Sequence, residues 1–467
     1  MLVRPLAPAL ALALAGLVAA PLAPALAGES DQITPFVVPE PSGLSNIARS
    51  TSGVAAGAGS SAGTSAALRA AASGVAAARV TSRLEPALFQ AAMVSALRGA
   101  ASSRYLSTRM SGMVLDAESG EVLWSHYSYK AKMPASTQKV MTAFTVLRSM
   151  NPEEQFVTTT SQSVANPGNV YLTGAGDPSL TATRLKSLAL RTATALKAKG
   201  ARTVNVYVDE SVFPAPTGTP GWKASYLRSD VQVVRGLTLA GYRGKDGAAA
   251  AGAAFAKYLT AYKVTGVYRG RGATPAETER LADSWSASVR SMVRTMLAYS
   301  VNDYAEYLLR HAARAQGMPA TARNAIANQV GKLGAAGIST AGYRAYDGSG
   351  LSRSNRMPAR TLAETVRALY VDPAAREVAF AWSGMPRAGQ TGTLRSRFRA
   401  KTQVCAKGRV LAKTGTLNDA VSLAGIAQGS DGRDRAFVLL ENGLTKASSV
   451  RLAMDSVATA VVGCRLG

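Results

Sequence analysis

A serine and a lysine three residues apart, Ser136 and Lys139, are the first residues whose types and spacing could do chemistry. Apolar residues follow at helical spacing, so the pair lies at a helix start, where positions i and i+3 project from the same side. A serine hydroxyl becomes a nucleophile when a neighbouring base takes its proton. A lysine amine can be that base if burial or nearby positive charge lowers its pKa. Alone, this short motif also fits a helix cap beside a solvated lysine.

Two further motifs could supply those surroundings. Ser300 and Asn302 fall at a corner between two stretches of helical periodicity, and Lys413-Thr414-Gly415 lies in a strand-like segment near the end of the chain. Two lysines close together, with Ser300 between them, would depress each other's pKa, so that one amine stays neutral and acts as a base. The three motifs together therefore predict one acyl-transfer site.

Each motif has a role in such a transfer. Ser300 can pass a proton to the leaving amine, and Asn302 can hold an amide of the substrate. The oxyanion would be bound by backbone N–H groups at Ser136 and at the end of the Lys413 strand. Charge and hydroxyl groups on that strand would anchor a terminal carboxylate. We expect the catalytic residues Ser136, Lys139, Ser300, Asn302 and Lys413, and the substrate-binding residues Thr414, Gly415 and Thr416.

In this order, the three motifs resemble those of penicillin-binding proteins of the D-alanyl-D-alanine carboxypeptidase/endopeptidase type, the low-molecular-mass class C. Residues 174–178, 347–353 and 389–394 also look like that family, and the resemblance covers roughly residues 85–467. It implies a serine acyl-enzyme hydrolase that cleaves D-Ala-D-Ala or a D-Ala cross-link in peptidoglycan and is acylated by β-lactams. By this resemblance Ser136 is the nucleophile and Lys139 the base. We expect no cofactor and no metal ion.

Other readings differ in chemistry. A β-lactamase shares the first step but needs a second activated water, and no Glu-x-x-Leu-Asn lies between Asn302 and Lys413. A wall-binding or penicillin-sensing protein would keep the site with little peptidase activity, and the intact set of motifs argues against it. A Ser-His-Asp triad is disfavoured because His311 falls in an expected helix and His126 in an expected strand. Asp347 fits a loop with an Asx turn better than a catalytic acid.

Hydrophobic periodicity predicts the elements that must position these motifs. Val140, Ala143, Phe144 and Leu147 form the buried stripe of the helix after Ser136. The segment 236–276 is rich in glycine and alanine and poorly patterned. We expect helices near 88–97, 182–199, 289–296, 301–312 and 450–461, and strands near 113–116, 122–127, 204–209, 410–416, 421–428 and 435–441.

These elements predict an α/β fold of the serine β-lactamase/DD-peptidase type. An antiparallel sheet of about five strands would be flanked by the terminal helices, beside an α-helical subdomain and an inserted accessory domain. We expect a signal peptide over 1–27, a low-complexity linker over 28–84, a DD-peptidase (transpeptidase-like) domain over 85–150 and 286–467, and the insert over 151–285.

The first residues predict export. Met1 to Ala27 contains one charged side chain, Arg4, and ends in Ala25-Leu26-Ala27 after an apolar run, which is typical of a secretory signal peptide. A membrane anchor is the alternative, but prolines interrupt the run. We expect the protein in the periplasm, or outside the cell and associated with the wall.

Charge and cysteine content refine the expected partners. A net charge of +25, from 53 Lys+Arg and 28 Asp+Glu, predicts attraction to anionic cell-wall polymers, and no nucleic-acid motif accompanies it. Cys405 and Cys464 fall in segments expected to be neighbours, and export permits a disulfide between them. Two buried, unlinked thiols are the alternative. Their spacing from the two histidines matches no structural zinc site.

Overall fold

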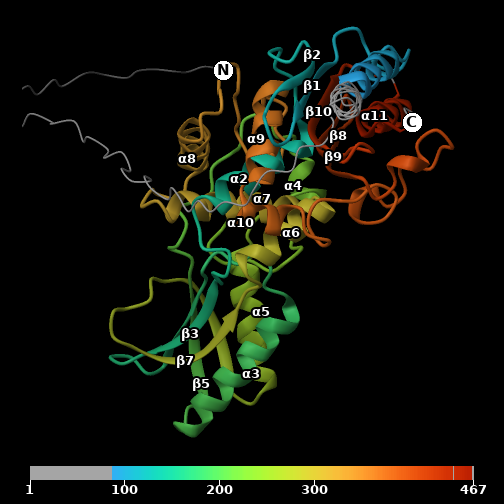
Figure 1. Ribbon diagram of the computed structural model, residues 1–467. Helices are drawn as coiled ribbons and strands as arrows, with labels where there is room; N and C mark the ends of the chain where they lie inside the picture. The colour runs from blue at the N-terminus through green and yellow to red at the C-terminus, as the bar shows by residue number, and fades with distance from the viewer. Residues whose placement is uncertain (1–86, 445, 465–467) are drawn as a thin grey trace, which may run out of the picture. The chain divides into compact units, whose positions relative to one another are not determined.

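The computed structural model describes residues 87–444 and 446–464 (Figure 1). The contacts along the chain divide it into residues 1–69 and 70–467, and every described residue belongs to the second unit. The expected signal peptide and the linker over 28–84 lie outside the described residues. Within the described part, no helix combines the length and the apolar character needed to cross a bilayer.

The expected antiparallel sheet of five strands is confirmed. Its order, β2-β1-β10-β9-β8, brings the two ends of the described chain into one sheet, with Met113 of β1 opposite Val438 of β10. Strand β8, which carries Lys413, is at one edge, with Lys413 opposite Ala424 of β9. The strands are β1 (Ser111–Asp116), β2 (Val122–His126), β8 (Val410–Leu417), β9 (Ala420–Gln428) and β10 (Asp434–Asn442).

Both faces of this sheet are buried. Along β10, Phe437 and Leu439 join an apolar cluster with the helix over 87–101 and α11 (Ala447–Val462), whereas Val438 points into a second cluster. Alternate residues of a strand face opposite sides, so one strand supplies two cores. The second cluster contains residues from α2 (Gln138–Leu147), α6 (Val289–Tyr299), α7 (Asn302–Arg314), α8 (Ala322–Ala335), α9 (Ala359–Val371) and α10 (Pro373–Ala379).

A second, mixed sheet lies in the segment expected as an insert. Its strand order is β6-β5-β4-β3-β7; β4, β5 and β6 run parallel, and β3 is antiparallel to both of its neighbours. Helices α3 and α5 make the crossovers that parallel neighbours require. The elements are β3 (Val157–Ser163), β4 (Asn169–Thr173), α3 (Ala182–Ala198), β5 (Thr203–Asp209), α4 (Tyr226–Ser229), α5 (Gly247–Ala261), β6 (Thr265–Arg271) and β7 (Thr278–Trp285).

The poorly patterned segment 236–276 contains α5 and β6. Small residues let this helix approach its sheet closely: a Cβ on Gly252 would lie 2.5 Å from Val208 and 2.6 Å from the Tyr268 ring. The same small residues weaken the amphipathic signal, which is why the sequence did not predict the helix. The structure does not divide residues 70–467 further, so the boundaries expected for the insert stay a prediction.

Candidate active site

Ser136 lies in a single 3-10 turn, η1 (Ala135–Thr137), immediately before α2. The preceding residue, Ala135, has a φ of 49°, a left-handed backbone conformation that residues other than glycine rarely adopt. Such backbone persists only where the surroundings enforce it, and it is concentrated at functional sites. Here Gly350 packs so closely on the turn that a Cβ would lie 1.9 Å from the Ala135 carbonyl oxygen.

Lys139 is one turn further along α2 and is completely buried. Its Nζ donates to Ser136 Oγ at 3.2 Å, to Asn302 Oδ1 at 2.7 Å and to the carbonyl oxygen of Ser349 at 2.6 Å. Burial lowers the pKa of this amine to about 8, although nearby carboxylates oppose the shift. A substantial fraction is therefore neutral near pH 8 and can accept the proton of the serine.

The second motif forms the corner between α6 and α7. Ser300 ends α6 with a φ of 61°, and Asn302 begins α7 after one extended residue. The amide of Asn302 is held at both ends, because its Nδ2 donates to the carbonyl oxygen of Asp230 at 2.9 Å while its Oδ1 accepts from Lys139. The expected tight corner is present, and Asn302 from it directly contacts the lysine.

The third motif reaches the serine along strand β8. A Cβ on Gly415 would lie 2.8 Å from the carbonyl oxygen of Pro134 and 3.0 Å from the backbone nitrogen of Ser136, so only glycine permits this approach. Lys413 is fully buried, and its Nζ donates to the carbonyl oxygen of Thr414 at 2.8 Å. Burial, and then the charge of Lys139, lower the pKa of Lys413 well below its usual value.

The hydroxyl residues of β8 are less buried than Lys413 and Gly415, with which they alternate along the strand. Thr414 is half-buried, and its Oγ1 donates to Thr393 Oγ1 at 2.8 Å, while Thr416 is exposed. Thr393 belongs to a short turn, η2 (Gly392–Leu394). This turn lies in residues 390–394, whose sequence repeats that of residues 413–417 except that glutamine replaces the lysine. That segment is therefore a neighbour of the site through a side-chain contact.

A buried acidic pair holds the loop that contacts Lys139. Glu306 Oε1 accepts from the backbone N–H of Gly348 at 3.0 Å and of Ser349 at 2.8 Å. Asp347 accepts from the backbone N–H of Gly350, three residues on, at 3.0 Å and from Trp222 Nε1 at 2.7 Å; the N–H of Ser349, which an Asx turn would use, donates to Glu306 instead. Burial and then the charge of Asp347 raise the pKa of Glu306 to about 7.

Sequence reasoning missed these supporting residues. Glu306 is four positions after Asn302, which places both side chains on one face of α7, and this spacing was the only signal available. The hydrogen bond between Trp222 and Asp347 joins residues 125 positions apart, and no local sequence pattern predicts it.

The two histidines have partners other than the serine. His311 is buried in α7, its Nε2 lies 3.0 Å from the Gly176 carbonyl oxygen, and burial lowers its pKa to about 4. His126 Nε2 lies 3.2 Å from the carbonyl oxygen of Thr108. Neither arrangement supports a Ser-His-Asp triad.

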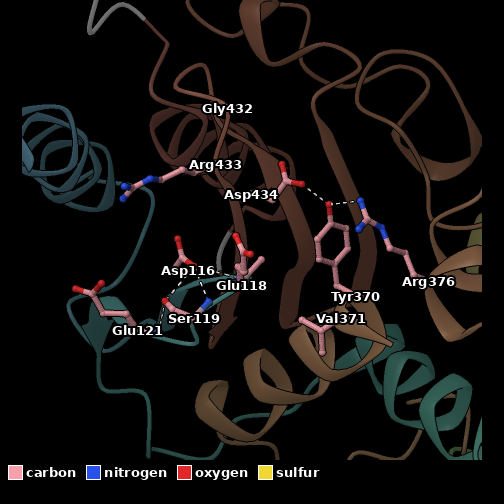
Figure 2. A pocket seen from close by; sticks show the side chains of 11 residues that line it. Asp116, Glu118, Ser119, Glu121, Tyr370, Val371, Arg376, Gly432, Arg433 and Asp434 are labelled. Atoms are coloured by element: carbon pink, nitrogen blue, oxygen red, sulfur yellow. Dashed lines mark hydrogen bonds between the residues drawn. The ribbon is translucent and has the colours of Figure 1, made fainter. Parts of the chain in front are cut away.

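A cavity of about 750 Å³ lies at the start of strand β10, where Asp434 lines it (Figure 2). Gly415 is aligned, through β9, with Leu440 near the other end of β10. The lining of the cavity mixes carboxylates with arginines, and Figure 2 shows the Tyr370 hydroxyl bonded to both Asp434 and Arg376. Burial and then Asp434 raise the pKa of Tyr370 to about 12. None of the expected site residues lines this cavity.

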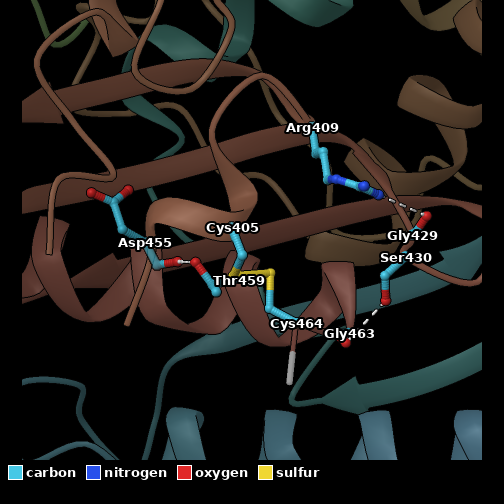
Figure 3. The surroundings of a disulfide bond; sticks show 8 residues. All are labelled: Cys405, Arg409, Gly429, Ser430, Asp455, Thr459, Gly463 and Cys464. Carbon is cyan, nitrogen blue, oxygen red and sulfur yellow. Dashed lines mark hydrogen bonds between the residues drawn. A yellow bond between two sulfur atoms is a disulfide. The ribbon is translucent and has the colours of Figure 1, made fainter. Parts of the chain in front are cut away.

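Cys405 and Cys464 form a disulfide in the structure (Figure 3), with their Cα atoms 6.1 Å apart. The bond joins η3 (Val404–Ala406) to the turn that follows α11. It closes a chain segment of 59 residues, for which loop entropy gives a stabilisation of about 4 kcal/mol. It thus ties α11 to the segment that leads into β8.

A buried lysine bonded to a serine, completed by an asparagine corner and a second buried lysine, defines a serine hydrolase of the penicillin-binding type. Residues 94–232 and 235–461 match the D-Ala-D-Ala carboxypeptidase 3 (S13) family, and the chain belongs to that family. It is accordingly a D-Ala-D-Ala carboxypeptidase, as the sequence predicted.

Individual relatives agree with this assignment. The chain is 30% identical over 384 residues to carboxypeptidase DacB of Mycolicibacterium smegmatis, covering 77% of this chain and 81% of the relative. It is 27% identical to a D-alanyl-D-alanine carboxypeptidase of Actinomadura sp., covering 76% and 83%. In fold, it is similar to penicillin-binding protein 4 of Haemophilus influenzae, with a TM-score of 0.65, 19% identity, and coverage of 78% and 97%.

Proposed function

We propose that the carboxypeptidase reaction of this protein proceeds through an acyl-enzyme on Ser136, with Lys139 as the base. The observation that carries this assignment is the contact of 3.2 Å between Lys139 Nζ and Ser136 Oγ in a site that buries the lysine completely. Burial lowers the pKa of the amine to about 8, so that it can exchange a proton near neutral pH.

The acylation step uses the surrounding motifs. Ser136 Oγ attacks the carbonyl carbon of the penultimate D-alanine while its proton passes to Lys139. The resulting oxyanion is bound by the N–H of Ser136 and by a backbone N–H of β8 beyond Gly415, since β8 runs beside this turn. When the C–N bond breaks, Ser300 passes a proton to the departing amine, and Asn302 holds the substrate amide.

The leaving group and the water complete the cycle. The terminal carboxylate of the substrate is held by the charge of Lys413 and by the hydroxyl groups of Thr414 and Thr416. Gly415, between the two threonines in the sequence, completes this substrate-binding segment. After D-alanine leaves, a water attacks the Ser136 ester and restores the hydroxyl. A β-lactam follows the same first step, but its ring-opened product stays attached to the serine.

The test is a pair of measurements on one variant. The wild-type protein should release D-alanine from a stem peptide ending in D-Ala-D-Ala and should retain labelled penicillin covalently, whereas Ser136→Ala should do neither. Release of D-alanine by a folded Ser136→Ala protein would refute the assignment of the nucleophile.

A β-lactamase remains the second candidate, because it shares the acylation step. The deciding quantity is the lifetime of the penicillin adduct, which we expect to be many minutes. Rapid turnover of the drug would favour the β-lactamase.

We also propose the setting of this reaction. An apolar stretch that ends in Ala25-Leu26-Ala27 supports export as a signal peptide, and the charge of +25 supports association with anionic wall polymers. Residues 85–150 and 286–467 are proposed as the peptidase domain and 151–285 as its insert. Mass analysis of the secreted protein tests the cleavage site after Ala27.

A further inference from the structure

A pocket of about 490 Å³ lies where β8 and β9 meet α6, α10 and the loop that follows α10, within the range of about 300–1,000 Å³ found for ligand sites. It adjoins the cavity of Figure 2, with which it shares Tyr370 and Arg376. None of the residues assigned to acyl transfer lines it. We call it the arginine pocket, because Arg294, Arg376 and Arg387 belong to its lining.

The lining of the arginine pocket has three guanidinium groups and one carboxylate. Arg294 comes from α6, Arg376 from α10 and Arg387 from the loop between α10 and η2, so the fold brings together cations from separate elements. The carboxylate, that of Glu377, is bonded at 2.5 Å to Arg290, which is not in the lining. The lining therefore has an excess of positive charge.

Two other carboxylates near Arg376 have partners of their own. Asp372, at the start of α10, pairs with Arg148 at 3.4 Å. Asp434 accepts a hydrogen bond from the Tyr370 hydroxyl, and Arg376 donates to that same hydroxyl oxygen at 2.7 Å, as Figure 2 shows. The charge of Arg376 is thus next to a phenol, and no carboxylate of the described residues forms an ion pair with it.

Two of the guanidinium groups lie over aromatic rings. That of Arg376 is 4.0 Å from the Tyr370 ring centre, and that of Arg387 is 5.3 Å from the Trp382 ring centre. This contact uses the face of a guanidinium, so the N–H donors in its plane can still bind a ligand. Within the described residues, the buried Nε atoms of Arg294 and Arg387 have no hydrogen-bond partner, which is unfavourable for a donor.

A phosphate group matches these donors better than a carboxylate does. The planar fork of a guanidinium binds two phosphate oxygens at once, and a phosphate has enough oxygens for more than one arginine. The buried part of the lining is apolar, since it includes Phe380, Leu411 and Ile426. Such a surface suits the carbon atoms next to a phosphodiester, whereas an inorganic ion would leave it uncovered.

We propose that the arginine pocket binds a phosphate group of an anionic, phosphodiester-linked wall polymer. The proposal rests on the wall setting given under the proposed function and deepens it, because it replaces a diffuse attraction by net charge with one defined site.

The arginine pocket is built on the elements that carry the active site. Leu411 of its lining is two residues before Lys413 on β8, and Arg294 is on α6, the helix that ends at Ser300. A polymer bound there would keep the enzyme on the wall and would leave the acyl-transfer residues unoccupied, since none of them lines the pocket.

The test measures the binding of a purified poly(glycerol phosphate) chain at physiological salt, where attraction between exposed charges is screened beyond about 8 Å. The Arg376→Ala, Arg387→Ala double variant should bind this polymer at least about tenfold more weakly than wild type, because it loses two guanidinium partners. The matched control, Arg323→Ala with Arg399→Ala, removes the same charge from two exposed arginines outside the pocket and should stay within about twofold of wild type. Penicillin labelling should be unchanged in both.

Two further measurements identify the group that is bound. Arg376→Lys with Arg387→Lys keeps both charges but loses both forks, and should bind the polymer at least about threefold more weakly than wild type. Excess inorganic phosphate should displace the polymer from wild type, whereas acetate at the same ionic strength should not.

Several outcomes would overturn the phosphate site. Equal weakening in the pocket variant and in its control would show that net charge alone holds the polymer. Displacement by acetate as effective as that by phosphate, or undiminished binding by the lysine variant, would exclude recognition of a phosphate by guanidinium forks. Binding of inorganic phosphate without binding of the polymer would exclude the wall polymer as the ligand. A wild-type protein that fails to retain penicillin would instead refute the proposed function and would leave these binding results standing.

Discussion

Glu306 accepts a hydrogen bond of 2.8 Å from the backbone N–H of Ser349, the residue whose carbonyl oxygen accepts from Lys139 Nζ at 2.6 Å. The buried carboxylate of Glu306 thus fixes the position of the Ser349 carbonyl oxygen, which accepts a hydrogen bond from Lys139. The same carboxylate raises the pKa of Lys139. Three carboxylates, those of Asp347, Glu306 and Asp303, raise the pKa of Lys139. The charge of Lys139 in turn lowers the pKa of Lys413. The charge of Arg310 lowers the pKa of Glu306.

The pH dependence of acylation should reveal this carboxylate. Lys139 acts as a base only when neutral, so acylation should rise with pH through its pKa of about 8. Glu306→Gln removes a charge that raises this pKa, so the acid limb should move to lower pH, by up to about one unit. Measuring the rate of fluorescent-penicillin labelling from pH 5.5 to 9.5 checks the shift.

The matched variant is Glu306→Ala, which also removes the acceptor for two backbone N–H groups. Its acid limb should move as in Glu306→Gln, and its acylation rate on the pH plateau should fall about tenfold, because the loop that holds Ser349 loses its support. An acid limb of Glu306→Gln that stays in place or moves to higher pH would contradict the electrostatic role.

Lys139→Arg separates charge from basicity. Arginine keeps the positive charge but does not release its proton in proteins, so acylation should fall about 10²–10⁴-fold. Penicillin labelling measures the rate, and thermal unfolding shows whether the variant is folded. Lys130→Arg, at an exposed position, is the control and should acylate normally. Near-normal acylation by a folded Lys139→Arg protein would exclude lysine as the base.

Gly350→Ala should disturb the serine turn more than an ordinary left-handed glycine would. Gly350 has a φ of 83° and its Cβ would lie 1.9 Å from the Ala135 carbonyl, whereas Gly337 has a φ of 70° with nothing within 4 Å. Gly337→Ala should therefore lower the free energy of unfolding by about 1–2 kcal/mol and leave acylation intact. Gly350→Ala should lower it further and slow acylation. Equal effects in urea unfolding and labelling would disprove the contact.

Loss of the disulfide should reduce stability by up to about 4 kcal/mol through the freed segment of 59 residues. Denaturant unfolding of wild type with and without reductant measures the loss. The Cys405→Ser, Cys464→Ser double variant should match reduced wild type and should not respond to reductant. A double variant as stable as the oxidised protein would argue that the bond contributes nothing.

The sequence predicted the parts of this molecule whose signals are local. The apolar stripe from Val140 to Leu147, the corner at Ser300 and the strand at Lys413 are each indicated by a pattern within a few residues. The other strands of the five-stranded sheet have similarly local patterns, so that sheet could be predicted. Strand β3 could not, because its run of threonine and serine lacks apolar alternation. Glu306 and Trp222 were missed because their roles depend on contacts with a loop distant in sequence.

The carbonyl oxygen of Asp230 that holds the Asn302 amide at 2.9 Å limits how far the chain can be trimmed. A miniature drug sensor made by splicing out residues 151–285 would strip one anchor from the amide and would remove the Trp222 indole that bonds Asp347. Engineers who shorten this protein should retain the stretch from Trp222 to Gln232, whose backbone N–H also bonds Asp303 at 2.7 Å.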